Sequence, residues 1–206
     1  MRSVYLLNGF NASFSEDMDT DYGLTLQFGA CPKYRDKSLK RGEINKTTMF
    51  FEVVKWLETY DCQANKYSFF RGLPLLRGVY LRKRLYARLE EDLLVGHDIV
   101  IFAKSLGAYT ALKVLDSLKD KYEVRNVKLI TVDAEDFGKD RVYNPNLKYW
   151  FNIYQTNGPV GMGGNTFNDI PENYVINVDG VNHKNIEEKM RGIGYWEIII
   201  KDLLGI

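Results

Sequence analysis

A serine stands where a strand-like apolar run changes into a helix-like pattern. The run Ile99–Phe102 leads into the segment 103–107, which reads Ala-Lys-Ser-Leu-Gly and has Ser105 at its centre. Small residues two positions to either side suit a sharp turn from strand to helix, because larger neighbours would collide there. Such a turn exposes the serine hydroxyl at a helix N-terminus and aims the N–H of Leu106 at a developing oxyanion. The segment predicts a nucleophilic serine; the competing interpretation is a serine that only caps a helix.

A nucleophilic serine needs a base, and the chain has two histidines, His97 and His183. In open parallel sheets the chemistry gathers beyond the carboxyl ends of the strands. His97 precedes the strand that begins near Ile99, so we expect it at the amino edge, as a surface residue. His183 follows the last predicted strand through the turn 179–182 and therefore belongs to the carboxyl edge. We expect His183 to be the general base.

The acid that orients this base has three candidates. The apolar run 128–132 ends at Asp133, and a carboxylate there stands beside the strand that carries the nucleophile. Asp136, three residues further on, is the alternative. Asp169 is a third and more distant candidate. We favour Asp133 and keep Asp136 open.

The loop after the first strand is expected to complete the oxyanion hole. Gly9 permits close backbone approach, and the N–H of Phe10 is the expected second donor, although a plain turn explains the same residues. Asn8, Gly9, Gln155 and Met162 are candidates for the substrate pocket. Met162 belongs to the glycine-rich segment 157–164, which lacks the Gly-Lys-Ser/Thr ending of a phosphate loop.

These residues depend on alternating strands and helices. Short apolar runs alternate with segments of helical period, which predicts the α/β class, with a mostly parallel central sheet in a three-layer α/β/α arrangement. The expected strands are 4–7, 67–70, 99–102, 127–132, 150–154 and 174–178. The expected helices are 47–60, 80–95, 107–118 and a terminal helical region 185–204 that is interrupted near Gly192 and Gly194.

Four blocks of the chain together resemble the α/β-hydrolase superfamily, at its small lipase and esterase end. The blocks are 4–11, 99–111, 129–134 and 174–186. Ala103 replaces the usual first glycine of the nucleophile motif, as it does in some lipases. The usual acid position of the family, one strand later than Asp133, is occupied by Gln155 and two further residues without a carboxylate.

The resemblance implies a serine hydrolase that cleaves an ester-type acyl bond through Ser105, His183 and Asp133. An acyltransferase, a thioesterase or an amidase would use the same residues. A non-catalytic binding protein on a hydrolase scaffold is the rival from another class. The expected partner is a small-molecule or acylated substrate, and no metal or organic cofactor is implied.

Chain length, net charge and cysteine content limit the domain organisation and the classes of partner that we expect. The 206 residues suit one domain over 1–206, with substrate-shaping insertions expected within 11–46 and 61–80. A net charge of +1 favours neither nucleic acid nor an anionic membrane, and the basic residues around Arg82 are expected on the solvated face of a helix. We expect no membrane span, no signal peptide and a cytoplasmic location. Cys31 and Cys62 are expected to be free thiols, with a single disulfide as the alternative.

Overall fold

A parallel β-sheet organises the chain. The structure is a computed structural model, which describes residues 2–8, 49–59, 65–71, 76–134, 145–157, 167, 170–183 and 185–205. Its six strands are ordered β2-β1-β3-β4-β5-β6, and every neighbouring pair is parallel. The α/β class predicted from the alternating pattern is confirmed.

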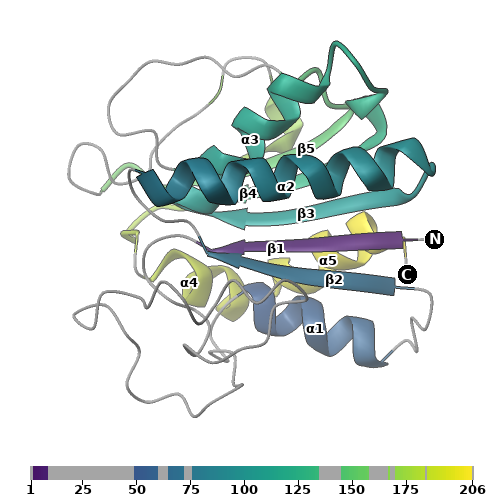
Figure 1. Cartoon of the computed structure of the whole chain (residues 1–206). Coiled ribbons are helices and arrows are strands. Elements are labelled where there is room, and N and C mark those ends of the chain that lie inside the picture. Colours follow the sequence, from purple (N-terminus) through teal and green to yellow (C-terminus); the bar gives the residue numbers. More distant parts are fainter. Residues whose placement is uncertain are drawn as a thin grey trace.

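Strands and helices alternate through most of the described chain (Figure 1). The strands are β1 (Arg2–Asn8), β2 (Asn65–Arg71), β3 (Asp98–Lys104), β4 (Lys128–Val132), β5 (Tyr149–Tyr154) and β6 (Val175–Asn177). The helices are α1 (Met49–Thr59), α2 (Leu76–Leu94), α3 (Leu106–Leu118), α4 (Ile186–Gly192) and α5 (Tyr195–Leu204), with short 3-10 helices η2 (Val124–Asn126) and η3 (Glu172–Tyr174).

The side of the sheet on which successive strands are added changes at β1. The chain passes from β1 to β2 on one side and then returns to place β3 on the other side of β1. In doubly wound sheets the crevice beyond the carboxyl ends of the two strands at such a reversal is the usual place for a ligand. The β1–β3 register ends with Leu7 opposite Ala103, two residues before Ser105. Ser105 therefore lies at the topological switch point.

Alternating side chains of the strands build two hydrophobic cores, one on each face of the sheet. On one face, Val100 and Phe102 pack in a buried cluster with residues of α1, α4 and α5. On the other face, Ile99 and Ile101 belong to a cluster that includes residues of α2 and α3. Figure 1 shows the same division, with α2 and α3 above the strands and α1, α4 and α5 below them. Because both faces are covered, the central strands are apolar without alternation, as a doubly buried parallel sheet requires.

The largest difference between a predicted and an observed helix boundary is at the start of α2. The structure begins α2 at Leu76, four residues before the predicted start at 80. Gly78 lies inside the added turn, and its low helix propensity hides this turn from a sequence pattern. The predicted interruption near Gly192 and Gly194 is confirmed, because Gly194 adopts a left-handed φ of 74° between α4 and α5.

The two expected insertions have different outcomes. Residues 11–46 lie outside the described residues, as do Cys31 and Cys62. Within 61–80, however, lie β2 and the beginning of α2. These residues form a strand of the sheet and a covering helix. The rest of the range in which we expected an insertion, 61–64 and 72–75, lies outside the described residues.

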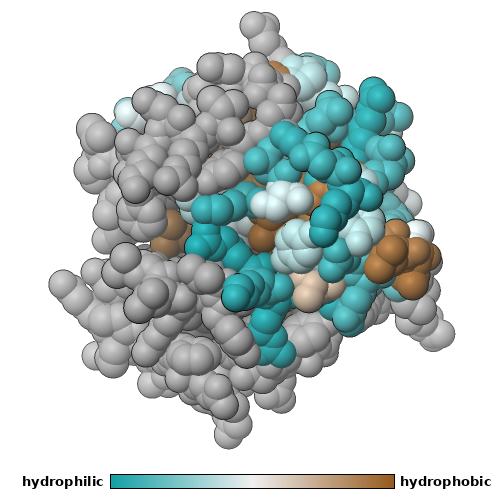
Figure 2. Space-filling view, turned by 45° about the horizontal axis from the view of Figure 1, so that its top comes forward, coloured by the Kyte–Doolittle hydropathy of each residue, from teal (hydrophilic) through white to brown (hydrophobic). Residues whose placement is uncertain are grey.

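The described surface is mainly hydrophilic on the side of α2 and α3 (Figure 2). Hydrophobic side chains gather where α2 ends, with Leu94 68% and Val95 66% exposed. Among the described helices, none is both long enough and apolar enough to cross a membrane.

Candidate active site

The backbone of Ser105 has the conformation of a sharp strand-to-helix turn. Its φ is 54° and its ψ is −126°, a region that residues with a Cβ rarely adopt and that costs on the order of 1–3 kcal/mol. The Ser105 N–H donates to the carbonyl of Val132 at 3.0 Å, which continues the β3–β4 ladder by one residue. The Ser105 carbonyl accepts from the N–H groups of Ala108 and Tyr109, which begin α3. Neighbouring elements on both sides thus hold the strained residue in place.

Ser105 does not serve as a conventional helix cap. Its side chain makes no capping hydrogen bond with α3, and its backbone lies outside the extended region typical of an N-cap residue. The competing interpretation expects a side-chain capping bond, and the structure gives Ser105 none with α3. Since the first N–H groups of a helix have no partner within it, the N–H of Leu106 lies in the turn where an oxyanion could be bound.

Small residues let α3 lie close to the sheet directly after this turn. Ala108 and Ala111 are fully buried in the cluster formed with Ile101 and Ala103 of β3. A larger side chain at these positions would push the helix, and with it Ser105, away from the sheet.

The register of the sheet places Asp133 beside Ser105. Lys104 pairs with Val132, so the next residue of each strand, Ser105 and Asp133, lie at neighbouring strand ends. Asp133 is fully buried and has a left-handed φ of 47°. Its N–H donates to the carbonyl of Ile153 at 2.7 Å, so the ladder with β5 also continues one residue beyond the strand.

His183 contacts this carboxylate directly. Its Nδ1 lies 2.6 Å from Oδ2 of Asp133, across 50 positions of sequence. Because an ionised carboxylate only accepts, this contact suits the tautomer with its proton on Nδ1, which leaves the lone pair on Nε2. In that tautomer the ring is oriented as a general base requires. The structure thus brings together two of the three side chains predicted for the triad, at the strand edge where the third is found.

The loop that carries His183 is anchored on both sides. Val178 and Val181 are buried in the cluster on the face of α1, α4 and α5. The Val178 N–H donates to the carbonyl of Tyr154 at 2.9 Å, and the Asn182 N–H donates to Oδ1 of Asn185 at 2.7 Å. These contacts hold the imidazole, whose side chain is 17% exposed, against a buried acid.

Gln155 has a role that the sequence reasoning missed. Its side chain is 1% exposed, and its Nε2 donates to Oδ2 of Asp133 at 3.1 Å. Its Oε1 accepts from the N–H of Asn157 at 2.7 Å, which orients the amide. Gln155 was expected to line the substrate pocket; the contacts that the structure gives its amide are with Asp133 and with the backbone of Asn157. The signal in the sequence was an amide at the strand end where the α/β-hydrolase superfamily, which the sequence resembles, carries its carboxylate.

A buried polar network joins β4 to β5 beneath the acid. Trp150 Nε1 donates to Oγ1 of Thr131 at 3.0 Å, and this hydroxyl donates to Oδ1 of Asn152 at 2.9 Å. Thr131 and Asn152 are fully buried. Since buried polar groups that lose a partner are costly, the network fixes the two strands laterally where they present Asp133 and Gln155.

His97 lies away from this site but is not a free surface residue. It precedes β3, at the amino edge as expected, and its side chain is only 19% exposed. Nδ1 lies 3.1 Å from Oδ1 of Asp92 and 3.1 Å from Oγ of Ser3. Expecting a surface position was wrong, because the end of α2 and the start of β1 close over the ring.

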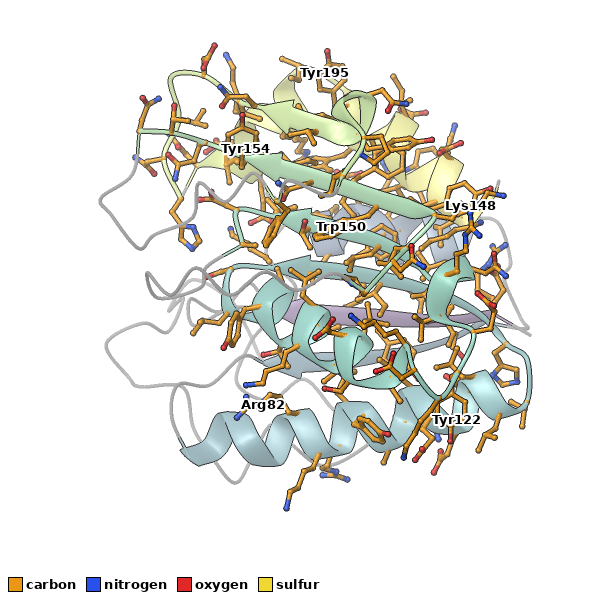
Figure 3. The ribbon with its side chains drawn as sticks, turned by 90° about the horizontal axis from the view of Figure 1, so that it is seen from above. Arg82, Tyr122, Lys148, Trp150, Tyr154 and Tyr195 are labelled. Atoms are coloured by element: carbon orange, nitrogen blue, oxygen red, sulfur yellow. The ribbon has the colours of Figure 1, made fainter. Side chains whose placement is uncertain are left out.

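Figure 3 shows which described residues lie near each edge of the sheet. Tyr154, at the end of β5, and Arg82, in the first half of α2, lie toward the carboxyl edge. Lys148 and Tyr122 lie toward the opposite edge (Figure 3).

Several predicted positions fall outside the described residues. They are Gly9, Phe10, Asp136, Met162 and Asp169; of Asn8, the last residue of β1, only the backbone is described. Within the described ranges, no three His, Cys, Asp or Glu side chains gather closely enough to hold a metal ion.

Comparison of the chain with protein-family models gives no match, and comparison with curated proteins gives none either.

Proposed function

We propose that this protein is a serine hydrolase of the α/β-hydrolase type, with the three-layer α/β/α architecture of that superfamily, and that it cleaves an ester-type acyl bond. The observation that carries the proposal is the 2.6 Å contact between His183 and the buried Asp133, at the edge where Ser105 occupies a strained turn. The order of these residues along the chain, serine, acid, histidine, supports the same conclusion.

The chemistry begins with proton transfer to His183. As Oγ of Ser105 attacks the substrate carbonyl carbon, Nε2 takes the hydroxyl proton, and Asp133 stabilises the resulting imidazolium. The carbonyl π electrons move to oxygen, and the N–H of Leu106 stabilises this oxyanion together with a second donor, expected from Phe10.

Collapse of the tetrahedral intermediate expels the alcohol, which takes its proton from His183, and leaves the acyl group on Ser105. His183 then removes a proton from water, which attacks the acyl carbon. The bond between Oγ of Ser105 and the acyl carbon then breaks, His183 returns the proton to Oγ, and the carboxylic acid is released.

Labelling with a fluorophosphonate probe tests the nucleophile. The wild type should be labelled and Ser105→Ala should not. Ser117→Ala is the matched control, because Ser117 is an exposed serine on α3, the helix that follows Ser105, and donates to the carbonyl of Lys113. Equal labelling of Ser105→Ala and wild type would disprove the assignment, and a wild type that is never labelled would favour a non-catalytic binding protein on this scaffold.

A panel of p-nitrophenyl esters of increasing acyl length tests the substrate class. Turnover that depends on Ser105 and ends in free acid supports ester hydrolysis. Turnover that is faster with an added alcohol or amine acceptor, and that ends in its acylated product, would favour an acyltransferase. Preference for thioesters or amides would favour the other two rivals.

A further inference from the structure

A buried ion pair lies beside the candidate site and takes no part in the proposed chemistry. Lys104, the residue before Ser105, donates from Nζ to Oε2 of Glu187 on α4. The side chains are 10% and 4% exposed. Buried ion pairs contribute little to stability compared with apolar residues of the same volume, because both charges lose their hydration. A role other than stability is therefore worth seeking for this pair.

Glu187 connects three elements at once. Besides Lys104 of β3, its Oε1 accepts from the N–H of Met49, the first residue of α1, at 3.1 Å. Its carbonyl accepts from Nε1 of Trp196 on α5 at 2.8 Å. The carboxylate is consequently held in one position by groups that belong to different parts of the fold.

A short hydrogen-bonded turn links Glu187 to His183. The Asn182 carbonyl accepts from the N–H groups of Asn185 and Ile186, both at 3.1 Å, which closes the chain around His183. Three residues stand between His183 and Glu187 in the sequence, and α4 begins at the last of them, Ile186. A displacement of Glu187 would therefore be transmitted to the imidazole.

The pair thus connects the residue next to the nucleophile with the turn that carries the base. We propose that Lys104 and Glu187 are positioning residues, which set the placement of the His183 ring relative to Ser105 while Asp133 sets its orientation. This inference rests on the proposed function. The Lys104–Glu187 pair supports His183 independently of Asp133, on the face of the sheet opposite α2 and α3.

The test compares Glu187→Gln, Lys104→Met and the double variant Lys104→Met/Glu187→Gln with the wild type. Glutamine keeps an oxygen that can accept from the Met49 N–H while it removes the charge. We expect kcat for p-nitrophenyl acetate, and the rate constant of fluorophosphonate labelling, to fall by about tenfold to a hundredfold with KM nearly unchanged. The double variant leaves no unpaired buried charge, so its thermal midpoint should recover toward that of the wild type while its kcat stays low.

Two controls separate positioning from general destabilisation. Arg191→Met breaks another ion pair between α4 and α1, with Glu52 at 3.2 Å, that does not reach β3. Asp92→Asn alters a buried carboxylate at the amino edge, where it contacts Tyr5 and His97. Both should keep kcat near that of the wild type below their thermal midpoints.

A spectroscopic measurement does not depend on turnover. The Nδ1 proton shared by His183 and Asp133 should give a downfield proton resonance, assigned by its loss in His183→Gln. We expect this resonance to shift or broaden in Glu187→Gln and in the double variant, but not in Arg191→Met. Recovery of both stability and kcat in the double variant, or an unchanged resonance in Glu187→Gln, would overturn the positioning role. A wild type that shows this resonance but is never labelled would instead overturn the proposed function.

Discussion

The side-chain amide of Gln155 donates to the same oxygen of Asp133 that contacts His183, at 3.1 Å and 2.6 Å respectively. The strand end where the α/β-hydrolase superfamily, which the sequence resembles, carries its acid thus supplies a donor to a carboxylate on the neighbouring strand. The carboxylate, Asp133, follows β4, and the amide that donates to it, Gln155, follows β5. This arrangement and the strain at Ser105 lead to three predictions, and a contact at the opposite edge of the sheet leads to a fourth.

Replacing the acid by its amide should remove most of the activity. Asp133→Asn keeps the shape of the side chain, but it lets the amide donate to His183 and favours the wrong tautomer. We expect kcat for a p-nitrophenyl ester to fall roughly ten-thousandfold, as in serine protease triads. Asp136→Asn is the matched control and should retain activity; loss of turnover in Asp136→Asn alone would reassign the acid.

Gln155 can be tested with a pair of variants that differ in charge. Gln155→Leu removes a hydrogen bond to a charged group, which is worth about 1.5–3 kcal/mol, so kcat/KM should fall by about tenfold to a hundredfold. Gln155→Glu places a second carboxylate against Asp133 and should lower kcat/KM further because like charges repel. An activity of Gln155→Glu equal to that of the wild type would show that this contact does not influence the acid.

The strain at Ser105 predicts a difference between two inactive variants. Glycine adopts the observed φ of 54° without the steric cost of a Cβ, whereas alanine keeps that cost. Ser105→Gly should therefore be more stable than Ser105→Ala by about 1 kcal/mol, measured by urea unfolding. The reverse order of stability would mean that the turn is relaxed in solution.

Tyr122 and Glu90 form a hydrogen bond at the edge of the sheet opposite the candidate site, and a titration can test this contact. The hydrogen bond from the Tyr122 hydroxyl to Glu90, at 2.7 Å, raises the pKa of Tyr122 above its ordinary value, because it favours the neutral phenol. The stability that this bond contributes is present below the ordinary phenol pKa and is lost as the pH rises through the raised value. Glu90→Gln should lower the pKa of Tyr122 in an ultraviolet titration corrected with Tyr122→Phe. No change in that titration would contradict the contact.

The elements themselves could be predicted from local patterns. Uniformly apolar runs such as 99–102 occur where a strand is buried on both faces, and the period of 107–118 matches a helix with one buried side. The turn at Ser105 was equally visible, since small residues at fixed offsets are a local steric requirement. Assigning His183 needed one further rule, that chemistry gathers at the carboxyl edge.

The sequence by itself determined the α/β class, the strand-to-helix turn at Ser105 and the edge of the sheet at which His183 lies, because steric and hydrophobic requirements act between residues close in the chain. The tertiary structure decided which groups meet across strands. Only the register of β3, β4 and β5 reveals that Gln155 donates to Asp133, and only the packing of α4 against β3 joins Lys104 to Glu187. These contacts span 22 and 83 positions of sequence, and no local pattern encodes a partner at such a separation. The geometry of these contacts follows from how whole strands and helices pack together. The same packing brings together the residues around Ser105.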